Sequence, residues 1–139
     1  MPHLTALSLS TALAYALLAY AYRRLSPAAS RWALLSVWVL HLLALLQGLF
    51  AEPPRFGFGP ALSVTVWLVL TVYAIESQLY PQLRVRWALA GLGTVAMLLA
   101  LVFPGQPYPG LRSPWLPLHW ALGIACYGLI AAAVVHAAL

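Results

Sequence analysis

The chain has 139 residues, of which 64% are hydrophobic and 6% are charged, and its mean hydropathy is +0.92. A soluble domain needs far more charge to cover its surface, so the composition excludes that class and indicates an integral membrane protein. The formal net charge of +5 rests on seven arginines in short segments between apolar runs. They form no basic stripe, which argues against nucleic-acid binding.

Five apolar runs follow one another, and each is long enough to cross a hydrocarbon layer of about 30 Å as a helix. They predict helices over about 4–22, 32–50, 61–80, 87–103 and 116–139. Arginine, proline and glycine separate the runs, and tryptophans and tyrosines stand at their ends, as in an aromatic belt. The predicted fold is all-α: a polytopic membrane helix bundle with five transmembrane helices in a single integral membrane domain, residues 1–139.

The distribution of the arginines predicts the orientation of the chain. Arg23, Arg24, Arg31, Arg84 and Arg86 lie in the first and third connections, whereas Arg55 and Arg112 lie in the second and fourth. Because positive charge favours the cytoplasmic side, the N-terminus is expected outside. Many alanines, leucines and arginines with no lysine are typical of a GC-rich bacterial genome, so the expected location is the bacterial cytoplasmic (inner) membrane.

His41 stands near the middle of the second run, about nine residues and therefore ~14 Å from its outer end. A neutral imidazole at that depth needs a partner, because hydrocarbon offers none. Two interpretations stay open. The ring either forms a hydrogen bond to a Ser, a Thr or a carbonyl of a neighbouring helix, or ligates an intramembrane metal such as haem iron.

His119 enters the last run just inside its outer end, between Trp115 and Trp120. It is either a residue of the interfacial aromatic belt or a haem ligand with the tryptophans packed against the haem edge. The local sequence alone supports these two interpretations about equally.

Glu76 is the only acid inside an apolar run, about one turn from the inner end of the third. Acids within membranes are functional candidates, but at this depth we expect an ion pair with Arg84, Arg86 or Arg24. The chain contains no nucleophile–base pair, no paired carboxylates and no nucleotide-binding glycine pattern, so enzymatic activity is not expected. The Gly91-x-Gly93 pattern indicates close helix packing.

Three segments carry a resemblance to a known family. LHWALGIACYGLIAAAVVHAAL, residues 118–139, resembles the Leu-His-x(7)-Tyr segment of the cytochrome c assembly membrane protein family, which includes the CcsA-like and HemX-like proteins. VLHLLAL, residues 39–45, is similar to the family's second helix with its mid-membrane histidine. ALSVTVWLVLTVYAIES, residues 61–77, is followed by the family's order of charged turn, apolar helix and Pro-rich loop.

The resemblance covers most of the chain and implies a haem-handling protein that binds or passes haem without catalytic turnover. It implies haem b as the cofactor, His119 as an outer-face axial ligand and His41 as a mid-membrane ligand. Their depths differ by six residues, roughly 9 Å, which suits two successive stations better than one shared iron.

The match lacks two features of the family's haem exporters, the tryptophan-rich outer segment and a second outer histidine. The chain therefore resembles the N-terminal portion of the family, and the HemX-like branch in character. The expected partners are the lipid bilayer, haem, and further helices from a partner chain, a second copy or a missing C-terminal half.

Two other functions remain as alternatives. One is a non-catalytic membrane regulator or scaffold of haem biosynthesis, which would bind its partner through the cytoplasmic arginine loops and the Ala/Gly helix faces. The other, ranked last, is a small transporter or channel subunit with Glu76 and His41 along the path, because intramembrane ionisable groups often mark one.

Overall fold

The computed structural model describes residues 2–51, 55–79, 86–107, 113 and 115–138. These ranges contain five α-helices, which confirms the predicted all-α fold: α1 (Pro2–Ala21), α2 (Pro27–Leu49), α3 (Phe58–Leu79), α4 (Arg86–Val102) and α5 (Leu116–Ala138). A 3-10 turn, η1 (Tyr22–Arg24), follows α1, and two short antiparallel strands, β1 (Arg55–Phe56) and β2 (Gln106–Pro107), pair with each other.

Three of the described helices are long and apolar enough to cross a membrane. They cover Thr5–Arg24, Pro27–Leu49 and Phe58–Glu76, with hydropathies of 1.3, 1.8 and 1.8. Helix α4 and the segment Leu118–Ile130 of α5 are apolar but shorter. The first three predicted spans thus meet the length and composition that a bilayer requires.

The start of α2 differs most from the sequence prediction, because the helix begins at Pro27 and not near residue 32. Ser26 is the N-cap, and its Oγ accepts a hydrogen bond from the Ala29 amide at 3.2 Å. Proline fits the first helical position, where no amide proton is needed. This cap signal lies upstream of the apolar run, so a search for apolar windows alone misses it.

We expect Ser26→Ala to lower the free energy of unfolding by about 1 kcal/mol, because the Ala29 amide loses its capping partner. Ser36→Ala is the matched control, since the Ser36 hydroxyl only donates to the Trp32 carbonyl within the same helix. Unfolding in mixed detergent micelles measures both variants. Equal destabilisation of the two would show that the cap contributes nothing.

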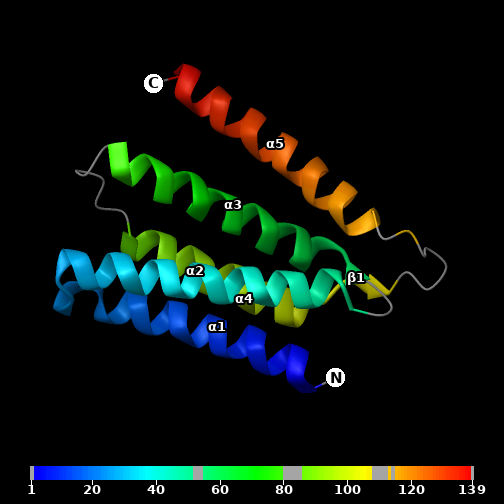
Figure 1. Cartoon of the computed structure of the whole chain (residues 1–139), viewed down its shortest axis with the longest axis horizontal. Helices are drawn as coiled ribbons and strands as arrows, with labels where there is room; N and C mark the ends of the chain where they lie inside the picture. The colour runs from blue at the N-terminus through cyan, green and yellow to red at the C-terminus, as the bar shows by residue number, and fades with distance from the viewer. Residues whose placement is uncertain (1, 52–54, 80–85, 108–112, 114, 139) are drawn as a thin grey trace.

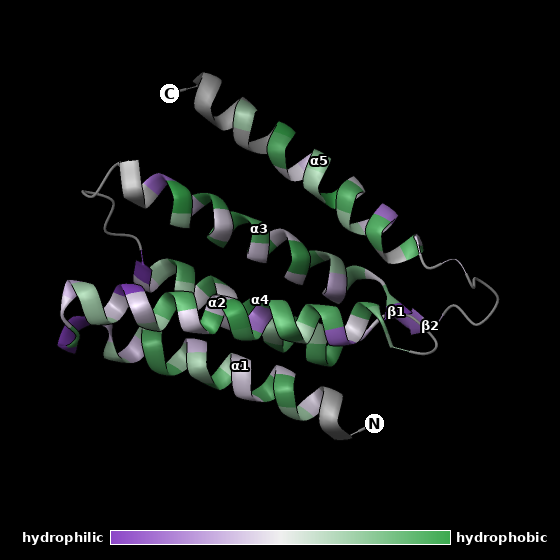
Figure 2. Cartoon of the chain, viewed as in Figure 1, coloured by the Kyte–Doolittle hydropathy of each residue, from purple (hydrophilic) through white to green (hydrophobic). Residues whose placement is uncertain are grey.

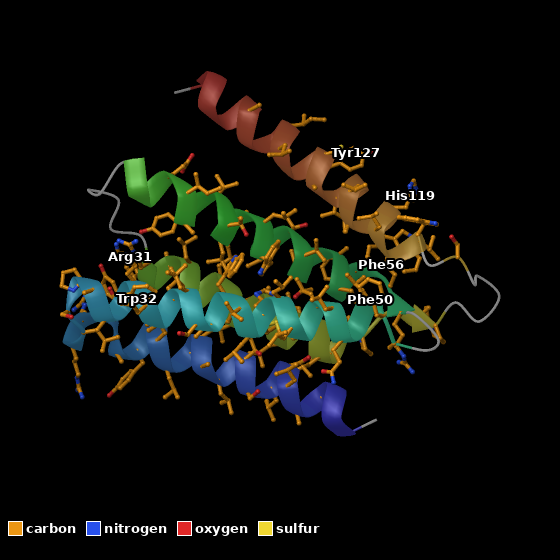
Figure 3. All side chains as sticks on the ribbon, viewed as in Figure 1. Arg31, Trp32, Phe50, Phe56, His119 and Tyr127 are labelled. Atoms are coloured by element: carbon orange, nitrogen blue, oxygen red, sulfur yellow. The ribbon has the colours of Figure 1, made fainter. Side chains whose placement is uncertain are left out.

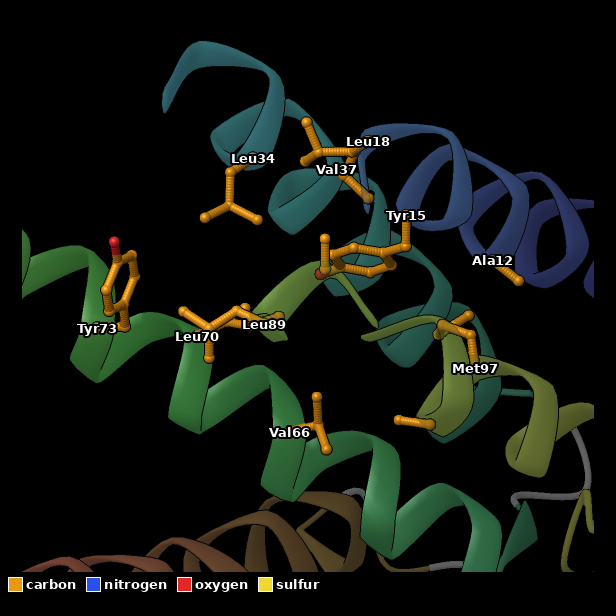
Figure 4. Packing of buried hydrophobic residues seen from close by; sticks show 12 residues of the cluster. Ala12, Tyr15, Leu18, Leu34, Val37, Val66, Leu70, Tyr73, Leu89 and Met97 are labelled. Atoms are coloured by element: carbon orange, nitrogen blue, oxygen red, sulfur yellow. The ribbon is translucent and has the colours of Figure 1, made fainter. Parts of the chain in front are cut away.

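The helices form a compact group with one outlying member (Figure 1). Helix α1 packs against α4 and α2, α3 packs against α4 and α2, and α5 lies along α3 on the side away from α1. The buried core lies among the first four helices, where Tyr15, Val37, Leu70 and Met97 come together (Figure 4). The core that positions the candidate site is therefore built without α5.

Two glycines allow α4 to approach its neighbours closely. A Cβ built on Gly93 would lie 2.8 Å from the Tyr15 ring, so this glycine makes room for that ring. A Cβ on Gly59, in the first turn of α3, would overlap the carbonyl oxygen of Phe103 and lie 2.9 Å from the Cα of Ala100. At Gly91, in contrast, nothing lies within 4 Å, so only the second glycine of the 91–93 pattern serves packing.

The strands β1 and β2 join the connection after α2 to the connection after α4. Arg55 pairs with Pro107 and Phe56 with Gln106. The Phe56 ring also stacks on Trp120 of α5, with centroids 4.4 Å apart and planes inclined by 22°. We call this arrangement the strand clasp; it lies at the same end of the bundle as the N-terminus (Figure 1).

Charged residues gather at the opposite end, where Figure 2 shows hydrophilic colour at η1 and at the starts of α2 and α4. There, Arg86 Nη1 donates to the Pro27 carbonyl and to Ser30 Oγ, both at 3.2 Å, and so ties α4 to α2. Arg84 and Arg112 lie outside the described residues. The described arginines of the first and third connections thus share one end, and Arg55 lies at the other.

Candidate functional site

His41 lies at the centre of a buried polar network. Its side chain is 0% exposed, and hydroxyl groups from two other helices engage both ring nitrogens. Tyr15 Oη of α1 lies 3.1 Å from Nδ1, and Ser63 Oγ of α3 lies 2.8 Å from Nε2. The Tyr15 ring also meets the imidazole edge to face, with an interplanar angle of 82°. The histidine therefore joins α1, α2 and α3 in the interior.

The direction of these hydrogen bonds follows from counting protons. A neutral imidazole donates from one nitrogen and accepts at the other. Among the described residues, His41 Nδ1 is the one hydrogen-bond partner of Tyr15 Oη, so the phenol must donate or leave its proton unsatisfied in the core. Nε2–H then donates to Ser63 Oγ, and the Ser63 hydroxyl proton is directed at Met97 Sδ, 3.6 Å away.

A pocket of about 350 Å³ adjoins this network at the end of the bundle that carries the N-terminus and the strand clasp. Ser63 and Met97 both line it, together with Gly48 near the end of α2 and Arg55 of β1. Most of its remaining wall is apolar. Its volume falls within the range of about 300–1,000 Å³ that is typical of small-molecule sites. Ser63 thus belongs to the histidine network and to the pocket wall at once.

A second polar network lies between α2 and α3. Trp38 Nε1 donates to Thr71 Oγ1 at 2.9 Å, and Trp67 Nε1 donates to the Trp38 carbonyl at 3.2 Å. The two indoles stack with centroids 4.9 Å apart. These bonds satisfy both indole N–H groups and hold the helices together, which is the usual role of polar side chains between membrane helices.

The second predicted site residue, His119, lies apart from His41. Its side chain is exposed, and Figure 3 shows it on the side of α5 that faces away from α3. Tyr127 points to the same side and is 78% exposed, and Cys126 is exposed as well. The structure therefore buries one of the two histidines in the bundle and leaves the other on the surface of its outermost helix.

Glu76 is half-buried near the end of α3. One of its predicted ion-pair partners, Arg84, lies outside the described residues. The other arginine of that connection, Arg86, donates to Pro27 and Ser30. The ion pair predicted for Glu76 stays a prediction.

The two histidines differ in their access to a ligand, and the arrangement does not fit a haem ligated by both. His119 has the exposure that an external ligand needs. His41 does not offer a free lone pair, since Nδ1 accepts from Tyr15 and Nε2 carries the proton donated to Ser63. Within the described residues, no cluster of three or more His, Cys, Asp or Glu side chains could hold a metal ion.

Comparisons with protein-family models, with curated proteins and with solved structures find no match to this chain.

Proposed function

We propose that the chain is a multi-pass membrane protein of the cytochrome c assembly type, which binds or passes haem without catalytic turnover. The observation that carries the proposal is a histidine fully buried near the middle of a long apolar helix, beside a pocket that opens at one end of the bundle. Burial of an imidazole among membrane helices is costly without a role in packing or function. Haem is proposed as the ligand because residues 39–45, 61–77 and 118–139 resemble that family.

In this proposal all five helices cross the bacterial inner membrane, with the N-terminus outside. The pocket and the strand clasp then face outward, and the end with Arg23, Arg24, Arg31 and Arg86 faces the cytoplasm. His119 would be the outer station, because its exposed imidazole is free to meet a ligand beyond α5. His41 would be the inner station if Ser63 released Nε2 and the proton moved to Nδ1, which would then donate to Tyr15 Oη as metal-bound histidines donate to an oxygen partner.

The chain alone would supply one protein ligand at each station. Iron in haem proteins commonly takes a second axial ligand, so further helices from a partner chain, a second copy or a C-terminal half would complete the outer site. The exposed, apolar face of α5 with Leu118, Leu122 and Tyr127 is available for such helices.

Haem titration of the purified protein in mild detergent tests the proposal. We expect a Soret band that falls by about half in His41→Ala and in His119→Ala and is lost in the double variant, because each histidine serves its own haem. Loss of nearly the whole band in either single variant would indicate one shared iron. A protein that gives no Soret band after reconstitution with haem would refute haem binding.

A scaffold that regulates haem biosynthesis is the second candidate, favoured by the arginine-rich end of the bundle. Such a scaffold should retain its partner when both histidines are replaced. Charge reversal at the exposed Arg23 and Arg24 should release that partner, and co-purification measures both outcomes.

A further inference from the structure

Ser63 ends the hydrogen-bonded chain that begins at Tyr15. Its oxygen accepts from His41 Nε2 at 2.8 Å, and its own proton is directed at the thioether of Met97 at 3.6 Å. A thioether is a weak acceptor, so this donor is poorly satisfied although the side chain is buried. Because both residues line the pocket, an oxygen atom of a bound molecule could replace the sulfur as acceptor.

The other end of the pocket carries a second donor. Ser63 lies five residues after the start of α3, about 7.5 Å along the helix axis, whereas Arg55 lies on the strand that precedes α3. Arg55 contributes to the lining where the pocket meets the strand clasp, and a guanidinium has five N–H donors and no acceptor. The rest of the wall is formed largely by alanine, leucine, valine and proline, with Thr5 and Ser8 of α1.

We propose that this pocket binds an uncharged, apolar ring compound with a carbonyl oxygen at each end, that is, a molecule of the quinone class. One carbonyl would accept from Ser63 and the other from Arg55, while the ring contacts the apolar wall. A fatty acid carries its oxygens at one end only and would leave the Ser63 proton with the thioether. The inference concerns the pocket beside the inner haem station and rests on the Ser63 donor, and quinone binding is measured separately from haem binding.

The test uses the full chain in detergent micelles and a short-chain benzoquinone, with binding measured by calorimetric titration. We expect saturable binding that becomes about tenfold weaker in Ser63→Ala, because one buried hydrogen bond to the ligand is lost. Ser63→Thr should retain binding, since it keeps the hydroxyl.

Ser63→Ala also removes a partner of His41, so a second variant must leave the network intact. Gly48→Leu does so: Gly48 lines the pocket, and a Cβ built there meets nothing within 4 Å. The added side chain would fill part of the cavity, and we expect quinone binding to fall at least tenfold. Gly123→Leu is the matched control. A Cβ at Gly123 of α5 also meets nothing within 4 Å, but Gly123 does not line the pocket. The quinone affinity of this variant should equal that of the wild type.

Equal quinone affinity in the wild type and Gly48→Leu would overturn the inference, because the molecule would then bind elsewhere on the apolar surface. Binding of decanoic acid but not of the quinone would also overturn it and assign the pocket to carboxylates. A protein that gives a Soret band but no quinone binding would refute this inference and leave the haem proposal intact. Quinone binding without a Soret band would refute the haem proposal and leave this inference intact.

Discussion

Gly59→Val is expected to lower the free energy of unfolding by about 3 kcal/mol. The new side chain would overlap backbone atoms of α4 and of the residue after it, the Ala100 Cα and the Phe103 carbonyl, and backbone cannot rotate away as a flexible side chain can. The two helices would have to separate along the side where they form the pocket wall.

Gly91→Val is the control for this prediction. It introduces the same β-branched residue into a helix, but a Cβ at Gly91 meets nothing within 4 Å. Replacing glycine by valine changes helix propensity by less than about 1 kcal/mol, so a larger difference between the two variants reports the packing of α3 on α4. Unfolding in mixed detergent micelles should show a clear gap between the two. Similar stabilities would mean that the contact at Gly59 is not tight.

The second large effect is expected at His41, which joins three helices. His41→Ala should lower the free energy of unfolding by about 3–4 kcal/mol, because it leaves a cavity and deprives the Tyr15 and Ser63 hydroxyls of their partner. Tyr15→Phe should cost about 1–2 kcal/mol, since it removes one hydrogen bond and keeps the ring.

His41→Gln separates the loss of hydrogen bonds from the loss of volume. The glutamine amide both donates and accepts, so it can replace the two roles of the imidazole, and we expect less than half the destabilisation of His41→Ala. A double-mutant cycle of Tyr15→Phe and Ser63→Ala measures the coupling free energy between them. A coupling different from zero would confirm that the two hydroxyls interact through His41. If His41→Ala were as stable as the wild type, the network would have no structural role.

The sequence predicted the five helices because uninterrupted apolar runs have one stable form in a membrane, and Pro/Gly-rich segments end them. It also predicted that His41 needs a partner. It could not say which partner, because Tyr15 and Ser63 lie 26 and 22 residues away, each in a different run. A tyrosine in the interior of the first run, where belts do not place one, was the available signal.

The arrangement of α5 could not be predicted from composition. Its apolar residues are spread around the helix, so no stripe indicates which face meets the bundle. His119 looked similar to His41 in sequence, as a histidine in a hydrophobic run, yet it is exposed on α5 while His41 is enclosed. Position along a helix gives depth, whereas rotation about the helix axis depends on which neighbours pack against it.

The strand clasp connects Arg55 to α5 through neighbouring residues. Arg55 is paired with Pro107, the neighbouring Phe56 is stacked on Trp120, and Gly105 adopts a φ of +80°, which brings the two connections together closely enough for this pairing. A shift of the β1 backbone therefore also disturbs the stack of Phe56 on Trp120 of α5. The clasp thus links a residue of the pocket lining to the helix that carries the exposed imidazole of His119.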